Sequence, residues 1–127
     1  MIAKVYCNCK YPAENSQVVL LPDGFKPGDT ATASVWTKGV AFVKAADHEA
    51  LRFRISIVWL DAAGKELRRD DSPYLKGTGK WEKLEYTTLG SPAGAKSLRF
   101  VLIHDLTNHE SWHKAALDNA DLRFNTR

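Results

Sequence analysis

The sequence has 127 residues and a mass of 14.2 kDa, the size of one domain with one hydrophobic core. Hydrophobic residues make up 44% and charged residues 26%, a globular composition that excludes a disordered or collagen-like chain. The net charge is only +3, and the basic residues Lys65, Arg68 and Arg69 are followed at once by Asp70 and Asp71, so nucleic acid is not favoured as a partner.

The sequence shows neither a membrane span nor a secretion signal. Its longest uninterrupted apolar runs have four residues, as in Val18–Leu21, whereas a spanning helix needs about 20. Met1–Tyr6 lacks an apolar signal region, so we expect a cytoplasmic protein if this is the whole chain and an extracellular one if it belongs to a longer secreted protein. Cys7 and Cys9 are too close in sequence for an easy mutual disulfide and are expected as thiols.

The first predicted elements are short strands over 2–7 and 17–21, within an otherwise irregular N-terminal segment over 1–24. A turn at 26–29 then leads into a clearer strand from Thr30 to Lys38. There, small apolar residues alternate with polar residues and Trp36, which predicts one buried and one exposed face.

The strongest period-two pattern runs from Leu51 to Trp59, where apolar residues alternate with Arg52, Arg54 and Ser56. This pattern predicts a strand with one buried face. The turn residues at 61–65 include Gly64, which can adopt positive φ, so the chain is expected to reverse into a second strand over 66–70.

Three further strands are predicted toward the C-terminus, over 81–88, 97–106 and 117–124. The second is apolar on both faces at its centre, as in a strand that is covered on both sides. Between the last two, 107–116 shows no alternation and is predicted as a loop, with a short helix capped by Asn108 as the alternative.

About seven or eight strands separated by turn signals predict an all-β fold. We expect a single domain over 1–127, an antiparallel β-sandwich of jelly-roll type.

Trp36 is the first candidate ligand-binding residue, because alternation places it on the polar face of its strand, opposite Ala33 and Val35. An exposed indole among hydrogen-bonding side chains suits a sugar ring, which stacks on the π surface; a covering loop is the alternative. Trp112, in the polar segment, is the second candidate. Trp59 and Trp81 are expected to be structural, each at a strand end.

Four polar residues are candidates for hydrogen bonds to such a ligand. Arg54 and Ser56 lie on the polar face of the best strand, and His104 and Asp105 end the strand over 97–106 at a rim. A solvated face is the alternative for the first pair.

The segment His109–His113 matches H-E-x-x-H, in which two histidines one helical turn apart bind zinc and a glutamate activates water. A catalytic zinc needs a third protein ligand, and the only acids after His113 are Asp118 and Asp121. We prefer a polar loop in which His109, Glu110 and His113 are together by chance. No G-x-S-x-G elbow is present either.

Five segments of the sequence carry motifs of one known family. These segments are Phe25–Gly39, Ile57–Leu67, Gly77–Leu84, Ser91–Phe100 and Leu117–Leu122. In that order they resemble the patterns "pG-tYt-S-WvKg", "D-a-x-G-k-e", "g-t-x-W-x-x-l", "a-P-a-g-A-k-s-l-r" and "f-D-n-v-x-L" of the carbohydrate-binding modules related to families 4, 9, 16 and 22. The resemblance covers roughly residues 25 to 124.

The resemblance implies a non-catalytic β-jelly-roll that binds polysaccharide or oligosaccharide through aromatic and polar residues. It also implies a structural calcium, to which Asp118 would contribute together with oxygen ligands from the N-terminal segment.

The leading hypothesis is therefore a glycan-binding module that uses Trp36 and Trp112. One alternative is a β-sandwich that binds proteins or small ligands and has no affinity for sugar; it predicts a covered Trp36 and an apolar interface. The other is a metal-dependent hydrolase, which requires His109 and His113 to converge with a third ligand.

Overall fold

The computed structural model describes residues 5–7, 13–41, 51–77, 80–106 and 113–126, and all structural statements concern these residues. They contain no helix, and hence none long and apolar enough to cross a membrane. Their strands are β1 (Val5–Cys7), β2 (Ala13–Leu20), β3 (Thr30–Ala41), β4 (Leu51–Leu60), β5 (Glu66–Asp71), β6 (Leu75–Lys76), β7 (Glu82–Thr87), β8 (Ser97–Leu106) and β9 (His113–Asn125).

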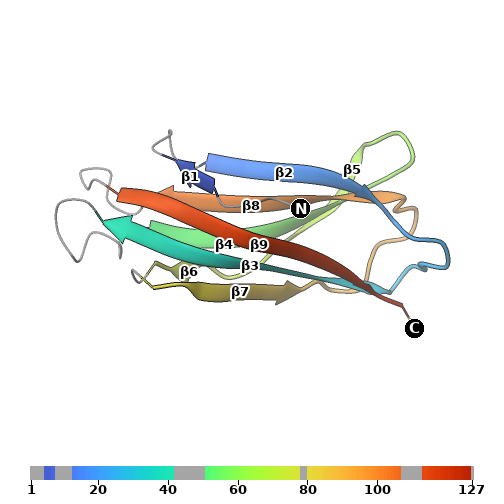
Figure 1. Cartoon of the computed structure of the whole chain (residues 1–127). Coiled ribbons are helices and arrows are strands. Elements are labelled where there is room, and N and C mark those ends of the chain that lie inside the picture. Colours follow the sequence, from blue (N-terminus) through green and yellow to red (C-terminus); the bar gives the residue numbers. More distant parts are fainter. Residues whose placement is uncertain (1–4, 8–12, 42–50, 78–79, 107–112, 127) are drawn as a thin grey trace.

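The strands form two antiparallel sheets that pack face to face. Sheet A has the order β1-β9-β3-β7, and sheet B has the order β2-β8-β4-β5, with β6 also paired to β4. Figure 1 shows β9 and β3 of sheet A crossing in front of β8 and β4 of sheet B. The predicted all-β antiparallel sandwich is thereby confirmed.

The hydrophobic core lies between the sheets and follows from strand alternation. Small side chains on β3, Ala31 and Ala33, face the interior together with large ones from β4, such as Phe53 and Trp59. Phe25, in the loop before β3, closes one end of the core: its ring centroid lies 6.0 Å from that of Trp59 and 5.6 Å from that of Phe124.

A β-bulge in β9 keeps the apolar residues of that strand on the inner face. Ser34 pairs with Asp121 but Trp36 pairs with Asp118, so β9 carries one extra residue between these pairs. Asn119 supplies it, with a φ of 52°. Leu117, before the bulge, and Ala120, Leu122 and Phe124, after it, can therefore all face the core.

Part of the outer face of sheet B is also apolar. Buried there are Val58 and Leu60 of β4 with Val101 and Ile103 of β8. The expectation that the strand over 97–106 is covered on both sides is confirmed, since β8 lies between β2 and β4 and is buried on both faces at its centre.

The prediction of a loop or helix over 107–116 is wrong for residues 113–116, which begin β9. They are extended because they pair with β3 on one side, and residues 115–117 pair with β1 on the other. These non-local pairs are invisible to a local pattern. Residues 107–112 lie outside the described residues, and so does Cys9.

Candidate functional site

The structure distributes the predicted ligand-binding residues over three places. Trp36 lies on the outer face of sheet A, Arg54, Ser56 and Asp105 lie on the outer face of sheet B, and His104 lies between the sheets. Trp112 is outside the described residues. The predicted residues therefore do not form one site.

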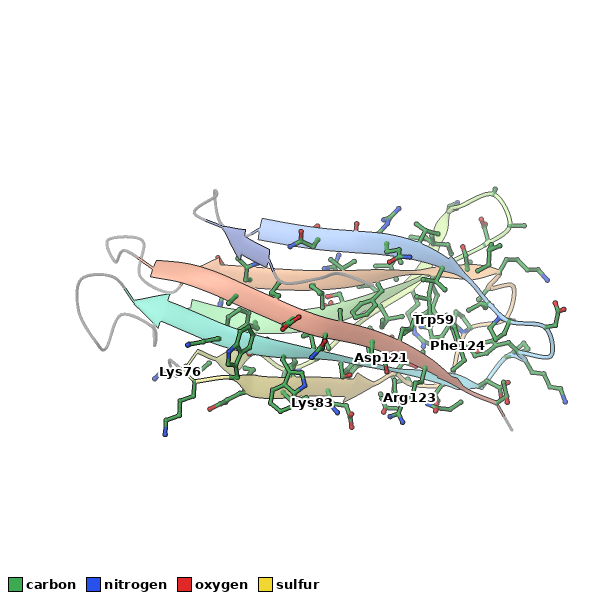
Figure 2. The ribbon with its side chains drawn as sticks, in the orientation of Figure 1. Trp59, Lys76, Lys83, Asp121, Arg123 and Phe124 are labelled. Carbon is green, nitrogen blue, oxygen red and sulfur yellow. The ribbon has the colours of Figure 1, made fainter. Side chains whose placement is uncertain are left out.

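Trp36 is the central aromatic residue on the outer face of sheet A, and 39% of it is exposed. The register places Lys83 of β7 on one side of it and Asp118 of β9 on the other. One row further along β3, Ser34 is flanked by Glu85 and Asp121. Figure 2 shows Lys83 and Asp121 on the strands that flank β3. The indole is thus surrounded by hydrogen-bonding and charged groups.

Trp81 is a second exposed tryptophan of the β3–β7 pair. It is 36% exposed and directly precedes β7, whose Glu82 pairs with Thr37. Extending this register by one residue brings Trp81 opposite Lys38, one diagonal step of about 7–8 Å from Trp36. Trp81 is therefore partly exposed, and its expected structural role stays a prediction.

Trp59, by contrast, is structural as predicted. It is fully buried, and its Nε1 donates a hydrogen bond to Asp70 Oδ2 at 3.0 Å. Asp70 is itself buried and also accepts two hydrogen bonds of 2.8 Å from Arg68. The two tryptophans differ in burial because Trp59 is in phase with the buried residues of β4, whereas Trp81 is out of phase with the buried Leu84.

Charges of both signs alternate across the outer face of sheet A. Lys83 Nζ lies 3.4 Å from Glu85 Oε2 on the same strand. Asp118 Oδ1 accepts a hydrogen bond of 2.9 Å from the backbone N–H of Asn119 at the bulge. The face therefore offers donors and acceptors around Trp36 with little excess charge.

The described residues around Asp118 do not by themselves make a calcium site. Nowhere in the described ranges do three or more His, Cys, Asp or Glu side chains gather in a way that could hold a metal ion. The further ligands were expected from the N-terminal segment, of which residues 8–12 lie outside the described chain. Calcium at Asp118 stays a prediction.

The outer face of sheet B carries a network of paired charges. Arg52 donates a hydrogen bond of 2.9 Å to Asp105, its register partner on β8. On β5, Asp71 accepts one hydrogen bond from Arg69 at 2.9 Å and a short one from Ser56. Ser56 is fully buried, so its hydroxyl is committed to Asp71 rather than exposed as predicted.

This network sets the protonation of Asp71. Partial burial acts to raise the pKa of this carboxyl, but hydrogen bonds from Ser56 and Arg69 and the positive charges of Arg69 and Arg54 outweigh it, so the pKa is lowered. Asp71 is thus held in its charged form.

Tyr74, between β5 and β6, adds an aromatic ring to the same face. The guanidinium carbons of Arg52 and Arg54 lie 4.0 Å and 3.9 Å from its ring centroid. Sequence analysis missed Tyr74 because it follows Pro73 in a stretch without alternation. No local pattern in the sequence indicates its contact with Arg52 and Arg54, because that contact forms only when the chain folds back on β4.

His104 does not lie at a rim. It is only 1% exposed and sits opposite Phe53 on the inner side of β8, in phase with Leu102 and Phe100. The strand continues to Leu106, so alternation carries His104 into the interior. A ligand on either outer face cannot reach it, and its predicted binding role is corrected.

The H-E-x-x-H match has no helix to support it at its second histidine. His113 is the first residue of β9 and pairs with Ala41, whereas the zinc motif needs both histidines on one helix face. His109 and Glu110 lie outside the described residues.

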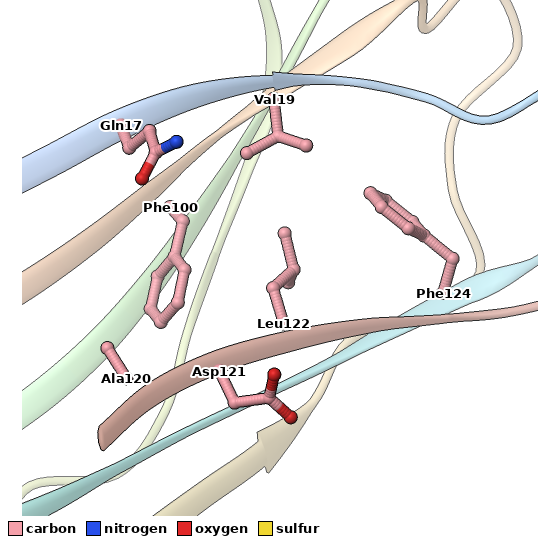
Figure 3. A pocket seen from close by; sticks show the side chains of 7 residues that line it. All are labelled: Gln17, Val19, Phe100, Ala120, Asp121, Leu122 and Phe124. Atoms are coloured by element: carbon pink, nitrogen blue, oxygen red, sulfur yellow. The ribbon is translucent and has the colours of Figure 1, made fainter. Parts of the chain in front are cut away.

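A cavity of about 210 Å³ opens between the sheets, at the β2 and β9 side. Figure 3 shows Val19, Phe100, Leu122 and Phe124 pointing toward one another, while Asp121 points away from them. Gln17 and Ala120 complete the lining. The cavity is mainly apolar and therefore offers few of the hydrogen bonds that a sugar needs.

Comparisons with known proteins agree on the fold. The chain superposes on a solved structure described as "CBM4 structure and function" with a TM-score of 0.60 and 11% identity, over 96% of this chain and 71% of that one. It superposes on the CBM22-1 xylan-binding domain of Paenibacillus barcinonensis Xyn10C with a TM-score of 0.53 and 19% identity, over 87% and 64%. No protein-family model and no curated protein sequence matches.

A third similar structure is the enzymatically active domain of bacteriophage CBA120 tailspike protein 4. Its TM-score is 0.57 and its identity 11%, and the match covers 96% of this chain but 19% of the tailspike chain. This chain spans less than two thirds of that structure and of the CBM22-1 structure. At these identities the likeness shows the fold alone: the chain is a β-sandwich like those of carbohydrate-binding modules.

Proposed function

We propose that this domain is a non-catalytic binding module for polysaccharide or oligosaccharide and that it binds its ligand on the outer face of sheet A. The observation that carries the proposal is the 39% exposure of Trp36 at the centre of an otherwise polar sheet face. The carbohydrate-binding-module fold supports it.

The physical argument rests on what an indole on a flat sheet can do. A sugar ring presents C–H groups on its faces and hydroxyls at its edge, so it binds best where an aromatic surface is bordered by donors and acceptors. Lys83 and Asp118 border Trp36 on the neighbouring strands, about 5 Å away. Because β3 is paired on both sides, its backbone is already ordered before the ligand binds. Binding at the indole therefore does not carry the entropy cost of ordering a loop.

Trp81 extends the surface along the same strand pair. Two exposed tryptophans one diagonal step apart form a platform longer than one ring. This favours a chain of sugars over a single monosaccharide as the ligand.

The alternative function, a protein-interaction domain, is favoured by a different observation. Val18 and Leu20, on the outer face of the edge strand β2, are 54% and 79% exposed. Exposed apolar residues on an edge strand can mark an interface.

The test is titration of the full chain with soluble xylan, β-glucan and mannan oligosaccharides, measured by isothermal titration calorimetry. Trp36→Ala is expected to weaken binding by about tenfold or more, and Trp36→Phe by less, because a smaller ring still stacks.

Trp81→Ala is expected to weaken binding to long oligosaccharides more than to short ones, because only a long ligand would reach from Trp36 to Trp81.

Leu67→Ala is the matched control, since Leu67 is also 39% exposed but lies on β5 of sheet B. It should bind the oligosaccharides as wild type does. Unchanged affinity in Trp36→Ala would remove sheet A from the site, and no binding of any neutral glycan would favour the interaction-domain alternative.

A further inference from the structure

The outer face of sheet B holds a second cluster with different chemistry. Arg52 and Arg54 project from one face of β4, and both guanidiniums contact the ring of Tyr74. One aromatic ring thus fixes two cations that would otherwise repel each other and move apart. Tyr74 itself is 38% exposed, so the cluster is open to solvent.

The charges in this cluster do not balance. Three arginines, Arg52, Arg54 and Arg69, face two carboxylates, Asp71 and Asp105. Asp105 is hydrogen-bonded to Arg52, and Asp71 to Arg69 and Ser56. Among the described side chains of this cluster, the arginines thus outnumber the carboxylates by one.

Of the three arginines, Arg54 has the longest contact with a carboxylate. Its nearest carboxylate contact is Asp71 Oδ2, 4.0 Å from Nη1, too far for a hydrogen bond. Its Nε is buried and meets no acceptor within the described part of the chain. The next acid on this face, Glu14 of β2, is separated from Arg54 by Ile103. Arg54 is nevertheless 27% exposed, so an added anion can reach it.

The floor of the cluster strengthens such an interaction. The register partner of Arg54 on β8 is the buried Ile103, and the next outward-facing pair is the buried Ser56 with Val101. An ion pair over an apolar floor is screened less than one in open water. A guanidinium fixed on an aromatic ring also loses little freedom when it donates two parallel hydrogen bonds to two oxygens of a carboxylate or sulfate group.

We propose that the outer face of sheet B is a second binding site, specific for an anionic polysaccharide, in which Arg54, held by Tyr74 beside Arg52, binds a carboxylate or sulfate group of the ligand. The site goes beyond the function proposed for sheet A and does not involve Trp36, because the two lie on opposite sheets. Carboxylate and sulfate groups share the required chemistry, and the test separates them.

The experiment is titration of the full chain with oligogalacturonate, with a sulfated oligosaccharide of equal length and with a neutral oligosaccharide, each at 20 mM and 200 mM salt. Arg54→Gln is expected to weaken anion binding by about tenfold or more. Arg54→Lys, which keeps the charge but loses the fork and the stacking, should also bind less tightly. The acidic oligosaccharide with the higher wild-type affinity identifies the group.

Arg123→Gln is the matched control, since Arg123 is an exposed arginine on β9 of sheet A. It should bind anions as wild type does, and Trp36→Ala should too, even if that variant loses neutral glycans. Equal losses in Arg54→Gln and Arg123→Gln would show non-specific charge attraction and overturn the proposal, as would failure of both anions to bind at 20 mM salt.

If Arg54→Gln does not fold, the wild type is titrated with the same acidic oligosaccharides and followed by NMR. The arginine Nε–Hε resonances are then expected to shift, and unshifted resonances would also overturn the proposal.

Discussion

At the scale of single residues, residues that share the outer face of a strand differ in how exposed they are. Trp36 and Arg54 were both predicted on polar strand faces, and both are accessible. Ser56 was predicted by the same reasoning, yet it is buried and bonded to Asp71. A period-two pattern shows which face a side chain is on but not what covers that face.

Asp71 makes the stability of the domain depend on pH. Its folded pKa lies below the ordinary value of 3.8, so the stability it contributes is full above that value and is lost as the pH falls through the folded pKa. Asp71→Asn is expected to be less stable than wild type at pH 7, with the difference shrinking toward pH 2. Urea unfolding between pH 2 and 7 measures this, and a difference that does not change with pH would contradict it.

At the scale of elements, the bulge in β9 decides which side chains reach the core. Without the extra residue at Asn119, the residues after it would change faces, and Leu122 and Phe124 would turn outward. The bulge also sets Asp118 beside Trp36. A small backbone irregularity thus positions both the core and the proposed glycan face.

Asn119→Ala is expected to destabilise the fold by about 1 kcal/mol, because Asn tolerates a φ of 52° better than Ala does. Asn119→Gly is the control and should be neutral within a few tenths of a kcal/mol or slightly stabilising. Thermal unfolding monitored by circular dichroism compares the three proteins. An Ala variant as stable as the Gly variant would show that the bulge is not strained by a side chain.

At the scale of the whole molecule, a buried polar network connects the core to the loop before β8. Asp70 accepts hydrogen bonds from Trp59 and Arg68, and Arg68 also donates to the carbonyl of Gly90 at 2.8 Å. Gly90 lies against Gly28, where an added Cβ would be 3.0 Å from the Gly28 carbonyl oxygen. The network therefore links β4 and β5 of sheet B to the loop that contains Gly90, and this loop in turn packs against the loop that contains Gly28.

Asp70→Ala is expected to lower the free energy of unfolding by about 2–3 kcal/mol, because it leaves the buried Trp59 Nε1 and the Arg68 guanidinium without their acceptor. Urea unfolding at pH 7 tests this. Lys83→Ala removes an exposed ion pair instead and should change stability by less than about 0.5 kcal/mol. Similar losses in both variants would refute a special role for Asp70.

Local alternation predicted most of the fold. The strand over 97–106 has the predicted bounds, and the hairpin around Gly64 forms where its turn residues indicate. The start of β9 and the pairing of β6 could not be predicted, because they depend on partners distant in sequence. For the candidate sites, the alternation along its strand predicted that Trp36 lies on an outer face. Tyr74 could not be predicted in the same way, because its place depends on contacts with Arg52 and Arg54 of another strand.

The position of β9 between β1 and β3 affects how the chain folds during synthesis. Sheet A lacks the strand between β1 and β3 until β9 has left the ribosome, so β1 and one edge of β3 have no strand to pair with before then. Pairing over such separations is slow and leaves strand edges open meanwhile. A nascent chain stopped before residue 113 would expose the inner residues of β3 and should be recognised by chaperones and proteases, whereas a chain that includes β9 should escape them.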